Sequence, residues 1–366
     1  MATSAVGLGI DLTDADEARI VASRDELESL LLVLRDIAPT PARNLERYLN
    51  PVAEWRLRTR ALRLDRPLIM GILNLTDDSF SGDGVGTAIE AARKRAEDLG
   101  KAGAKIIDVG AESARADRPV LDARAESELV RAAVAALAGD GHLVSSDTYK
   151  PEVARAAIEA GAEVINDISG LTLGAGAARE AASAGAGYVL NYSYSVPKRR
   201  PDTPPQYDDV VSETIAWMEQ RLRELSAAGL PRESVAIDPG IAFGKSHDED
   251  IQVLRRIGEL RTFGQPILLA HSRKNFIGSI SGQHPTARDL ETHVASAMAL
   301  EQGVRIFRVH DPEGARRALE IAAAISLAPQ GAFAPDQTSW PWRAGASAAH
   351  MTKAEPDKAA PAGQRW

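Results

Sequence analysis

Residues 142–167 read HLVSSDTYKPEVARAAIEAGAEVIND, and this stretch decides the fold. An apolar run ending in Asp147 is followed, after a proline, by the apolar spacing of an amphipathic helix. Gly161 then suits the left-handed conformation in which many helices end, and a second apolar run leads to Asn166. The stretch therefore predicts a strand, a helix and a second strand parallel to the first.

The same alternation of short apolar runs and helical patterns continues in both directions along the chain. The chain is rich in Ala, Val, Ile and Leu, which suits parallel strands covered by helices on both faces. We therefore predict an α/β fold, a (β/α)8 TIM barrel with an N-terminal helical extension and a flexible C-terminal tail. The predicted strands are 67–73, 104–110, 142–147, 162–167, 186–191, 234–238, 265–270 and 303–309.

The barrel is expected to occupy residues 56–328, with different patterns on either side of it. Within the extension, residues 1–55, the segment 25–37 (DELESLLLVLRDI) carries an apolar stripe and is predicted to be helical. Residues 56–66 alternate basic and apolar side chains, which favours a short hairpin at the base of the barrel. Residues 329–366 are rich in Ala, Pro and Gly without periodicity, which predicts the flexible tail.

Composition excludes several classes of function. The chain has 366 residues and a net charge of −8, which disfavours a nucleic-acid-binding protein. It has no cysteine, so disulfides, thiolate metal sites and a cysteine nucleophile are excluded. No apolar run approaches the length of a membrane span, about 18 residues, and the N-terminus lacks the pattern of a secretory signal. We expect a cytoplasmic protein.

Polar side chains gather at the predicted strand ends, where barrels of this kind carry their active sites. Asp147, Asn166 and Asp238 can pair with the donor edge of a planar heterocycle, because charge-assisted pairs of this type are strong. Asn74 can give an oxygen to Mg²⁺, which prefers such ligands.

The cations come from the last two strands, where barrels commonly bind phosphate. Lys274 follows the seventh predicted strand, and Arg308 and His310 belong to the eighth. An arginine and a histidine so close together can clamp a leaving pyrophosphate. The residues therefore predict a site for a polar heterocycle that carries a pyrophosphate.

At this point six segments, taken in chain order, resemble the dihydropteroate synthase family. They are IMGILNLTDDSFSGDG (69–84), IIDVGAESAR (106–115), SSDTYKPEVARAAIEAGAEVINDISG (145–170), AIDPGIAFGK (236–245), HSRKNFIG (271–278) and RIFRVHD (305–311). The family condenses 6-hydroxymethyl-7,8-dihydropterin pyrophosphate with p-aminobenzoate, which gives 7,8-dihydropteroate and pyrophosphate in folate biosynthesis. The resemblance implies a transferase that uses Mg²⁺ and forms a homodimer, while the charge and the short apolar runs argue against a nucleic-acid or membrane partner.

The resemblance also implies roles for single residues. It implies that Lys274, Arg308 and His310 are catalytic and that Asn74 binds the metal. The pterin positions are Asp147, Asn166, Asp238 and Lys274, the pyrophosphate positions are Asn74, Arg308 and His310, and the acceptor loop contains Arg115, Ala114 and Asn275.

The sequence departs from the family pattern in the loops beside the acceptor. Asp77 replaces a proline, Ala114 replaces a threonine, and Asn275 replaces a serine. These changes leave open a catalytically altered pterin-binding paralogue, an enzyme with another arylamine acceptor, and a pterin-dependent methyltransferase, although the last needs no pyrophosphate clamp. We also expect weak binding of sulfonamides, which mimic p-aminobenzoate, because Ala116 replaces a rigid proline in the second loop.

Overall fold

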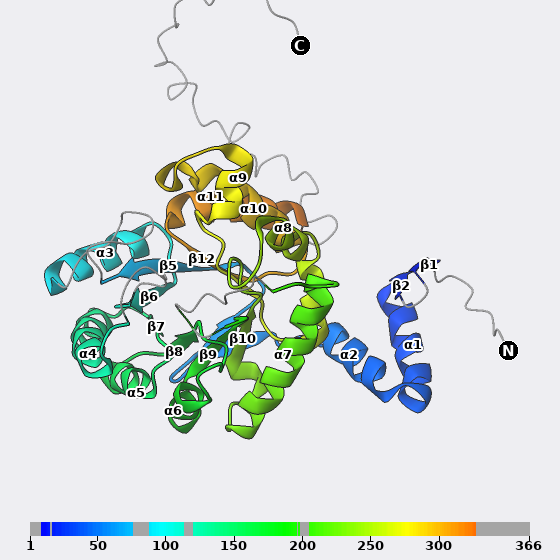
Figure 1. The fold of residues 1–366 in the computed structure, drawn as a ribbon, viewed down its shortest axis with the longest axis horizontal. Helices are drawn as coiled ribbons and strands as arrows, with labels where there is room; N and C mark the ends of the chain where they lie inside the picture. Colours follow the sequence, from blue (N-terminus) through cyan, green and yellow to red (C-terminus); the bar gives the residue numbers. More distant parts are fainter. Residues whose placement is uncertain are drawn as a thin grey trace, which may run out of the picture. The chain divides into compact units, whose positions relative to one another are not determined.

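The structure, a computed structural model, describes residues 9–14, 17–75, 88–112, 120–195, 197 and 205–326. Eight parallel strands form one sheet in the order β10-β9-β8-β7-β6-β5-β12-β11 (Figure 1). A bridge between Ile237 and Ile267 joins β10 to β11, so the sheet closes on itself and the predicted TIM barrel is confirmed. The strands are β5 (Leu68–Asn74), β6 (Ile106–Gly110), β7 (Val144–Asp147), β8 (Val164–Asp167), β9 (Gly187–Asn191), β10 (Val235–Asp238), β11 (Leu268–Leu269) and β12 (Ile306–Val309).

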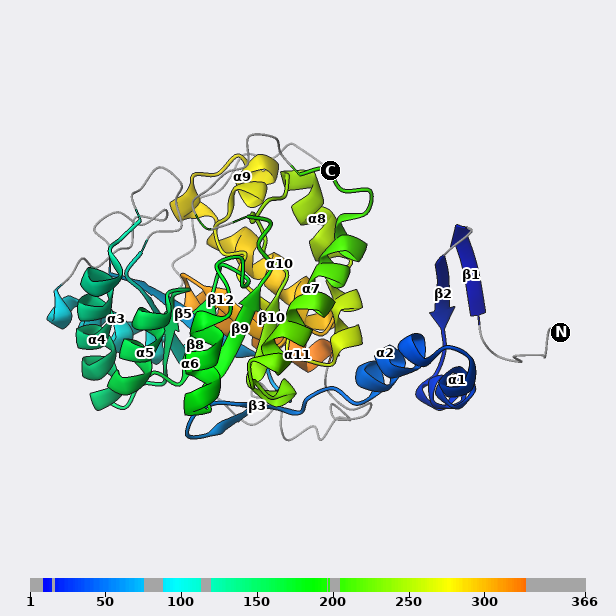
Figure 2. The ribbon, with the colours of Figure 1, turned by 60° about the horizontal axis from the view of Figure 1, so that its bottom comes forward.

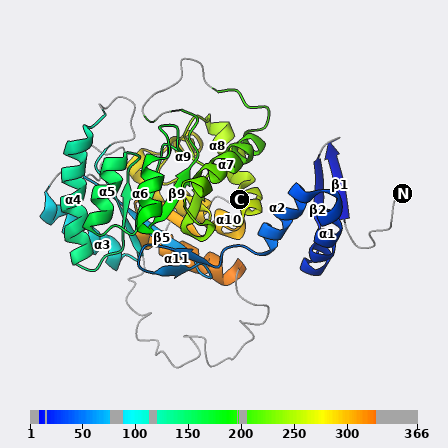
Figure 3. The same ribbon diagram turned by 90° about the horizontal axis from the view of Figure 1, so that it is seen from below.

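Helices surround this sheet and bury its outer face. Helices α4, α5 and α6 pack side by side along one flank (Figure 3). The predicted strand, helix and strand of residues 142–167 are present as β7, α5 and β8. Gly161 caps the C-terminus of α5 with φ 118°. None of the described helices is long and apolar enough to cross a membrane. The helices are α3 (Ile89–Lys101), α4 (Ala123–Gly139), α5 (Pro151–Ala160), α6 (Gly176–Ala184), α7 (Val210–Ala227), α8 (His247–Arg255), α9 (Asn275–Ser281), α10 (Asp289–Glu301) and α11 (Pro312–Ser326), with short 3-10 helices η1 (Arg232–Ser234), η2 (Ile257–Phe263) and η3 (Pro285–Ala287).

The N-terminal segment contains the helices α1 (Arg24–Ile37) and α2 (Pro39–Leu49). Ser23 caps the N-terminus of α1. Its hydroxyl accepts from the Glu26 amide, and its own amide donates to the Glu26 carboxylate. The two helices meet at a small apolar cluster centred on Leu31, Ala42 and Leu49. A hairpin of β1 (Gly9–Asp14) and β2 (Glu17–Val21), which the sequence analysis does not predict, precedes them. The predicted C-terminal tail lies outside the described residues.

A second hairpin closes the base of the barrel, close to where the sequence predicts one. It consists of β3 (Glu54–Arg56) and β4 (Ala61–Arg63), and Figure 2 shows β3 below the barrel strands. Trp55 is 0% exposed and its indole Nε1 donates to the Ser234 carbonyl at 3.0 Å. Its ring belongs to a cluster with the lower strand residues Met70 and Ile306. The hairpin therefore fills the barrel floor, so the opposite end remains for a site.

Replacing Trp55 by alanine should lower the free energy of unfolding by about 3–5 kcal/mol, because a large cavity would open in the floor. Trp55→Phe should cost less, since it keeps most of the apolar volume and loses the hydrogen bond. Urea denaturation measures both. The exposed Leu32 of α1 offers a control, and Leu32→Ala should change stability by less than about 0.5 kcal/mol. Equal effects of the Trp55→Ala and Leu32→Ala variants would contradict a floor held by Trp55.

Candidate active site

Strand register brings four positions into one row at the open end of the barrel. Asn74 pairs with Gly110, Gly110 with Asp147, and Asp147 with Asn166, across β5, β6, β7 and β8. A Cβ atom on Gly110 would lie 3.4 Å from the Asp147 Cβ and 3.8 Å from the Asn74 Oδ1. The glycine therefore leaves space between an amide and a carboxylate that both face the barrel mouth.

Arg308 lies below this row and bonds to two carboxylates. Its Nε donates to the Asp108 Oδ2 at 2.6 Å, and its Nη2 donates to the Asp147 Oδ2 at 2.8 Å. The Asn166 Nδ2 donates to the same Asp108 oxygen at 3.0 Å. Burial raises the pKa of Asp147 to about 7, although the Arg308 guanidinium opposes this rise. Asp147 and Asn166, which the sequence analysis grouped with Asp238, are thus connected to Arg308, which it assigned to the pyrophosphate.

Asp108 is a member of this group to which the sequence analysis gave no role. Its side chain is 0% exposed, and its Oδ1 is buried without a hydrogen-bond partner among the described residues. A carboxylate inside an otherwise apolar strand, IIDVG, is the sequence signal that marks such a residue.

His310, which the sequence analysis paired with Arg308 as a clamp, contacts Ser272. The His310 Nδ1 lies 2.8 Å from the Ser272 Oγ, and the His310 amide donates to the same hydroxyl at 3.2 Å. Ser272 therefore ties the end of β12 to the turn that follows β11. Carboxylates bind the Arg308 side chain, and a serine hydroxyl contacts the His310 ring.

Asp238 and Lys274 form the other half of the mouth. Burial raises the pKa of Asp238, and the positive charge of Lys274 opposes the rise. Burial lowers the pKa of Lys274 to about 8, while Asp238 and Asp250 oppose that fall. The Lys274 Nζ donates to the Ile241 carbonyl at 2.6 Å. Asp238 and Lys274 thus favour each other's charged form, because each opposes the shift that burial causes in the other's pKa.

That loop depends on a glycine and on a lysine that the sequence analysis missed. Gly240 has φ +67°, and a Cβ atom there would lie 2.1 Å from the Tyr192 carbonyl oxygen, so no other residue fits. Its amide donates to the Asp238 Oδ1 at 2.8 Å. The Lys245 Nζ donates to the Pro239 carbonyl at 2.9 Å and lies 3.6 Å from the centre of the Tyr192 ring. Burial lowers the pKa of Lys245 to about 7.

A buried arginine holds the turn that carries Lys274. The Arg288 Nη1 donates to the carbonyls of Arg273 and Lys274 and to the Asn275 Oδ1 at 3.2 Å. Arg273 has φ 58° and forms a bidentate pair with Asp289 at 2.7 Å. Asn275, which the sequence assigns to the acceptor loop, begins α9 and uses its side-chain oxygen to bind Arg288.

A second buried network fixes the two ends of the loop after β6. The Lys150 Nζ donates to the Glu112 Oε2 at 2.7 Å and to the Glu126 Oε2 at 2.5 Å. The Leu121 amide donates to the same Glu112 oxygen at 2.7 Å, and the Tyr149 hydroxyl donates to the Glu112 Oε1. The predicted acceptor residues Arg115 and Ala114 belong to this loop but lie outside the described residues, as do Asp77 and Ala116.

Asn74 is the side chain that fits a Mg²⁺ ion. Within the part of the chain that the structure describes, its amide forms no hydrogen bond, and no group of three His, Asp or Glu residues could hold a metal alone. Mg²⁺ commonly takes one or two protein oxygens and completes its shell with water and substrate phosphate. A single amide oxygen at the barrel mouth agrees with that pattern.

Asp167, the last residue of β8, follows Asn166 and bonds to the barrel wall. Its carboxylate accepts from the Ser169 amide at 2.7 Å and from the Tyr188 hydroxyl. Both oxygens are therefore used within the barrel wall. It differs in this way from Asp238, which keeps an oxygen for other partners.

A (β/α)8 barrel with buried carboxylates, an amide, a lysine and an arginine at its mouth defines a class of proteins that bind a polar, charged small molecule. Residues 70–310 match the family described as pterin binding enzyme, and the chain belongs to that family. It is 36% identical over 265 residues to the dihydropteroate synthase of Escherichia coli (strain K12), which covers 72% of this chain and 93% of that protein.

Solved structures agree with this assignment. The Yersinia pestis dihydropteroate synthase with a sulfonamide drug superimposes with a TM-score of 0.70 and 33% identity, and covers 74% of this chain and 98% of its own. The Thermus thermophilus dihydropteroate synthase in complex with 4-aminobenzoate gives a TM-score of 0.65 and 35% identity, with 74% and 99% covered. The chain is thus a pterin-binding enzyme homologous to dihydropteroate synthases.

Proposed function

We propose that this enzyme condenses 6-hydroxymethyl-7,8-dihydropterin pyrophosphate with p-aminobenzoate to give 7,8-dihydropteroate and pyrophosphate. The observation that carries the proposal is that Asp147, Asn166 and Asp238 lie at the carboxyl ends of their strands, where burial raises the pKa of both acids. Carboxylates and amides accept hydrogen bonds from the N–H edge of a pterin. The homology to dihydropteroate synthases supports the same reaction.

In the proposed reaction, the bond between the pterin methylene carbon and the pyrophosphate oxygen breaks, and pyrophosphate leaves with the electron pair. The arylamine nitrogen then attacks the methylene carbon, a C–N bond forms, and the nitrogen loses a proton. A neutral arylamine needs no strong general base for this attack. Asp238, Asn166 and Asp147 hold the pterin, while Lys274, Arg308 and His310 stabilise the charge that develops on the leaving group.

The charged groups can act without leaving their present contacts. Arg308 uses Nε and Nη2 for the carboxylates, and its Nη1 forms no hydrogen bond with the described residues. Lys274 has a pKa of about 8, so it carries its charge at neutral pH. Mg²⁺, when bound through Asn74, would add positive charge at the pyrophosphate.

The full chain, incubated with the pterin pyrophosphate, Mg²⁺ and p-aminobenzoate, tests the proposal. We expect dihydropteroate and pyrophosphate in equal amounts. Binding of the pterin pyrophosphate without turnover would instead favour the catalytically altered paralogue. Turnover with another arylamine, but not with p-aminobenzoate, would favour a different acceptor. Methyl transfer from methyltetrahydrofolate to a corrinoid would favour the methyltransferase alternative.

Sulfonamides should inhibit this enzyme at least tenfold more weakly than the Escherichia coli enzyme at equal saturation with p-aminobenzoate. Ala114 and Ala116 stand where the family has threonine and proline, and alanine does not fix the backbone φ angle as proline does. The inhibition constant of sulfamethoxazole measures the effect. Ala116→Pro should recover part of the inhibition, and equal inhibition of the unaltered enzymes would refute this expectation.

A homodimer is the assembly we propose for the enzyme. Helix α10 exposes Leu290, Val294 and Met298 at intervals of one turn, with exposed fractions of 72%, 54% and 65%. Helix α11 packs against α10 and exposes Ile321 and Ile325. A contiguous apolar surface of this kind marks a protein interface, and a second copy of the chain would cover it symmetrically.

The double substitution Val294→Glu and Met298→Glu should convert the dimer into a monomer in light scattering, because it buries two charges at the proposed interface. The matched control changes Leu32 and Val33 to glutamate on the exposed apolar face of α1. That control should remain dimeric. A monomeric control beside a dimeric α10 variant would place the interface on α1 instead.

A further inference from the structure

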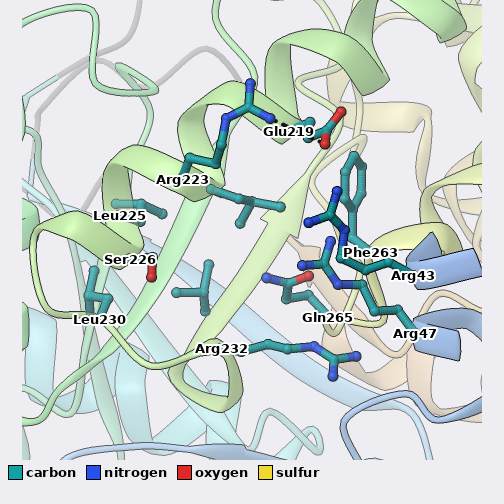
Figure 4. Close-up of a pocket in the computed structure, with 12 residues that line it drawn as sticks. Arg43, Arg47, Glu219, Arg223, Leu225, Ser226, Leu230, Arg232, Phe263 and Gln265 are labelled. Carbon is teal, nitrogen blue, oxygen red and sulfur yellow. Dashed lines mark ion pairs between the residues drawn. The ribbon is translucent and has the colours of Figure 1, made fainter. Parts of the chain in front are cut away.

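A cleft of about 330 Å³ lies at the end of the barrel opposite to the site described above. Val235, the first residue of β10, lines it, whereas Asp238, the last residue of the same strand, faces the active site. Its walls come from α2, α7, η1 and the segment around Phe263 (Figure 4). Leu222, Leu225 and Leu230 give the cleft an apolar side.

Four arginines and one glutamate line this cleft. Arg223 pairs with Glu219 at 3.2 Å, so that pair is neutral. Arg43 and Arg47 of α2 and Arg232 of η1 have no ion pair with any carboxylate in the described ranges. These three side chains, together with the apolar side, are called the arginine cleft below.

Arg232 is the most constrained of the three cations. Its Nη2 donates only a long hydrogen bond, 3.3 Å, to the Asn50 carbonyl, and its Nε is buried without a partner among the described residues. Burial and the neighbouring charge of Arg47 lower its pKa, while Glu233, itself paired with Arg56, opposes the effect. A Cβ atom on Gly264 would lie 1.9 Å from the Arg232 Nη2, so the glycine makes room for this guanidinium. The described part of the chain thus holds these positive charges close together without a carboxylate to pair with them.

A bound anion would supply the missing negative charge. A guanidinium binds phosphate through two parallel N–H donors, and arginine is the preferred residue for such recognition. A carboxylate offers a single charge against three cations, whereas a phosphate monoester offers nearly two. The apolar side would contact the organic part of the ligand.

We propose that the arginine cleft is a second ligand site, which binds a small organic phosphate at the foot of the barrel. Arg43 and Arg47 precede residue 70, where the match to the pterin-binding family begins, so the site depends on the N-terminal segment. Phosphate would bridge α2 to η1, next to the contact in which Arg261 donates to the Tyr48 hydroxyl at 3.0 Å. Bound ligand would therefore fix α2 against the barrel.

Hydrogen exchange of the full chain, with and without phenyl phosphate, tests the proposal at the place where it acts. We expect at least tenfold slower exchange of the amides of α2 when the ligand is present. Inorganic phosphate should need a roughly tenfold higher concentration, because it lacks the apolar ring. The active site can also bind phosphate, but that binding would leave α2 unprotected, so the readout separates the two sites.

The variant Arg47→Gln, Arg232→Gln should lose this protection and should melt at or above the temperature of the unaltered protein in phosphate-free buffer, since repulsion has been removed. Arg131→Gln, which breaks a surface pair with Glu159 on α5, is the matched control and should keep the protection. Equal exchange of α2 with and without phenyl phosphate would overturn the proposal. Equal protection in the double variant would also overturn it.

Discussion

Replacing Arg308 by methionine is expected to lower the free energy of unfolding by about 3–5 kcal/mol at pH 8, because Asp108 and Asp147 would both lose the guanidinium that they bond to. Asp108 is 0% exposed and Asp147 is 16% exposed, and both bond to this guanidinium. Methionine has a similar length but no charge. The same variant should have almost no transferase activity, since Arg308 is also proposed to stabilise the leaving pyrophosphate.

The loss of stability in the Arg308→Met variant should grow as the pH rises. Asp147 has a pKa of about 7 in the folded protein, above the value near 4 of an unfolded chain, so its protonation favours the folded state. Its contribution to stability is complete below about pH 4 and is lost as the pH rises through 7. Without Arg308, the pKa of Asp147 should rise further, because the guanidinium now opposes the rise. The deficit of the variant should therefore be largest at pH 8 and should shrink at pH 6.

Chemical denaturation at the two pH values measures this effect. Arg256 offers a matched control, because it also bonds to two carboxylates, Asp209 and Glu259, but all three side chains are 30% exposed or more. Arg256→Met should cost about 1 kcal/mol or less. A deficit for Arg308→Met that is no larger than this, or that does not depend on pH, would show that the buried carboxylates do not need the arginine.

The strands of the barrel were predictable because parallel strands buried on both faces appear as short, nearly continuous apolar runs. The predicted and observed lengths differ most at β11, where residues 265–270 were predicted and only Leu268 and Leu269 pair regularly. Pro266 has no amide hydrogen to give to the ladder, although its carbonyl accepts from Ile237 at 2.9 Å. The sequence analysis did not identify the hairpin β1–β2, although Ile10 and Leu12 alternate with Asp11 and Thr13 as side chains do in a strand.

The positions of the site residues could also be predicted, since strand ends in a barrel meet at one mouth. Their partners could not. Arg308 and His310 are two residues apart in the sequence, yet one bonds to Asp108 and Asp147 and the other to Ser272. Partner choice depends on the stagger between β12 and the distant strands. Lys245 was missed for a similar reason, because the turn that aims it depends on positive φ at Gly240 and Ala242.

Asp238→Asn should weaken binding of the pterin pyrophosphate by roughly 10- to 100-fold, the usual effect of losing a hydrogen bond to a charged group. Asparagine keeps an oxygen for the Gly240 amide, which donates to the Asp238 Oδ1 at 2.8 Å, so the loop after β10 should remain in place. Only the charge and the second oxygen are lost. Isothermal titration without the arylamine measures the binding, and urea denaturation should show a fold at least as stable.

The pH profile separates this role from a structural one. Burial raises the pKa of Asp238, so binding to the unaltered enzyme should weaken as the pH falls and the carboxylate takes up a proton. The Asp238→Asn variant should lack this acid limb. Asp167→Asn is the control, since both oxygens of Asp167 are used by Ser169 and Tyr188. It should change stability but leave the affinity and its acid limb intact, and the opposite pattern in the two variants would assign recognition of the pterin to Asp167.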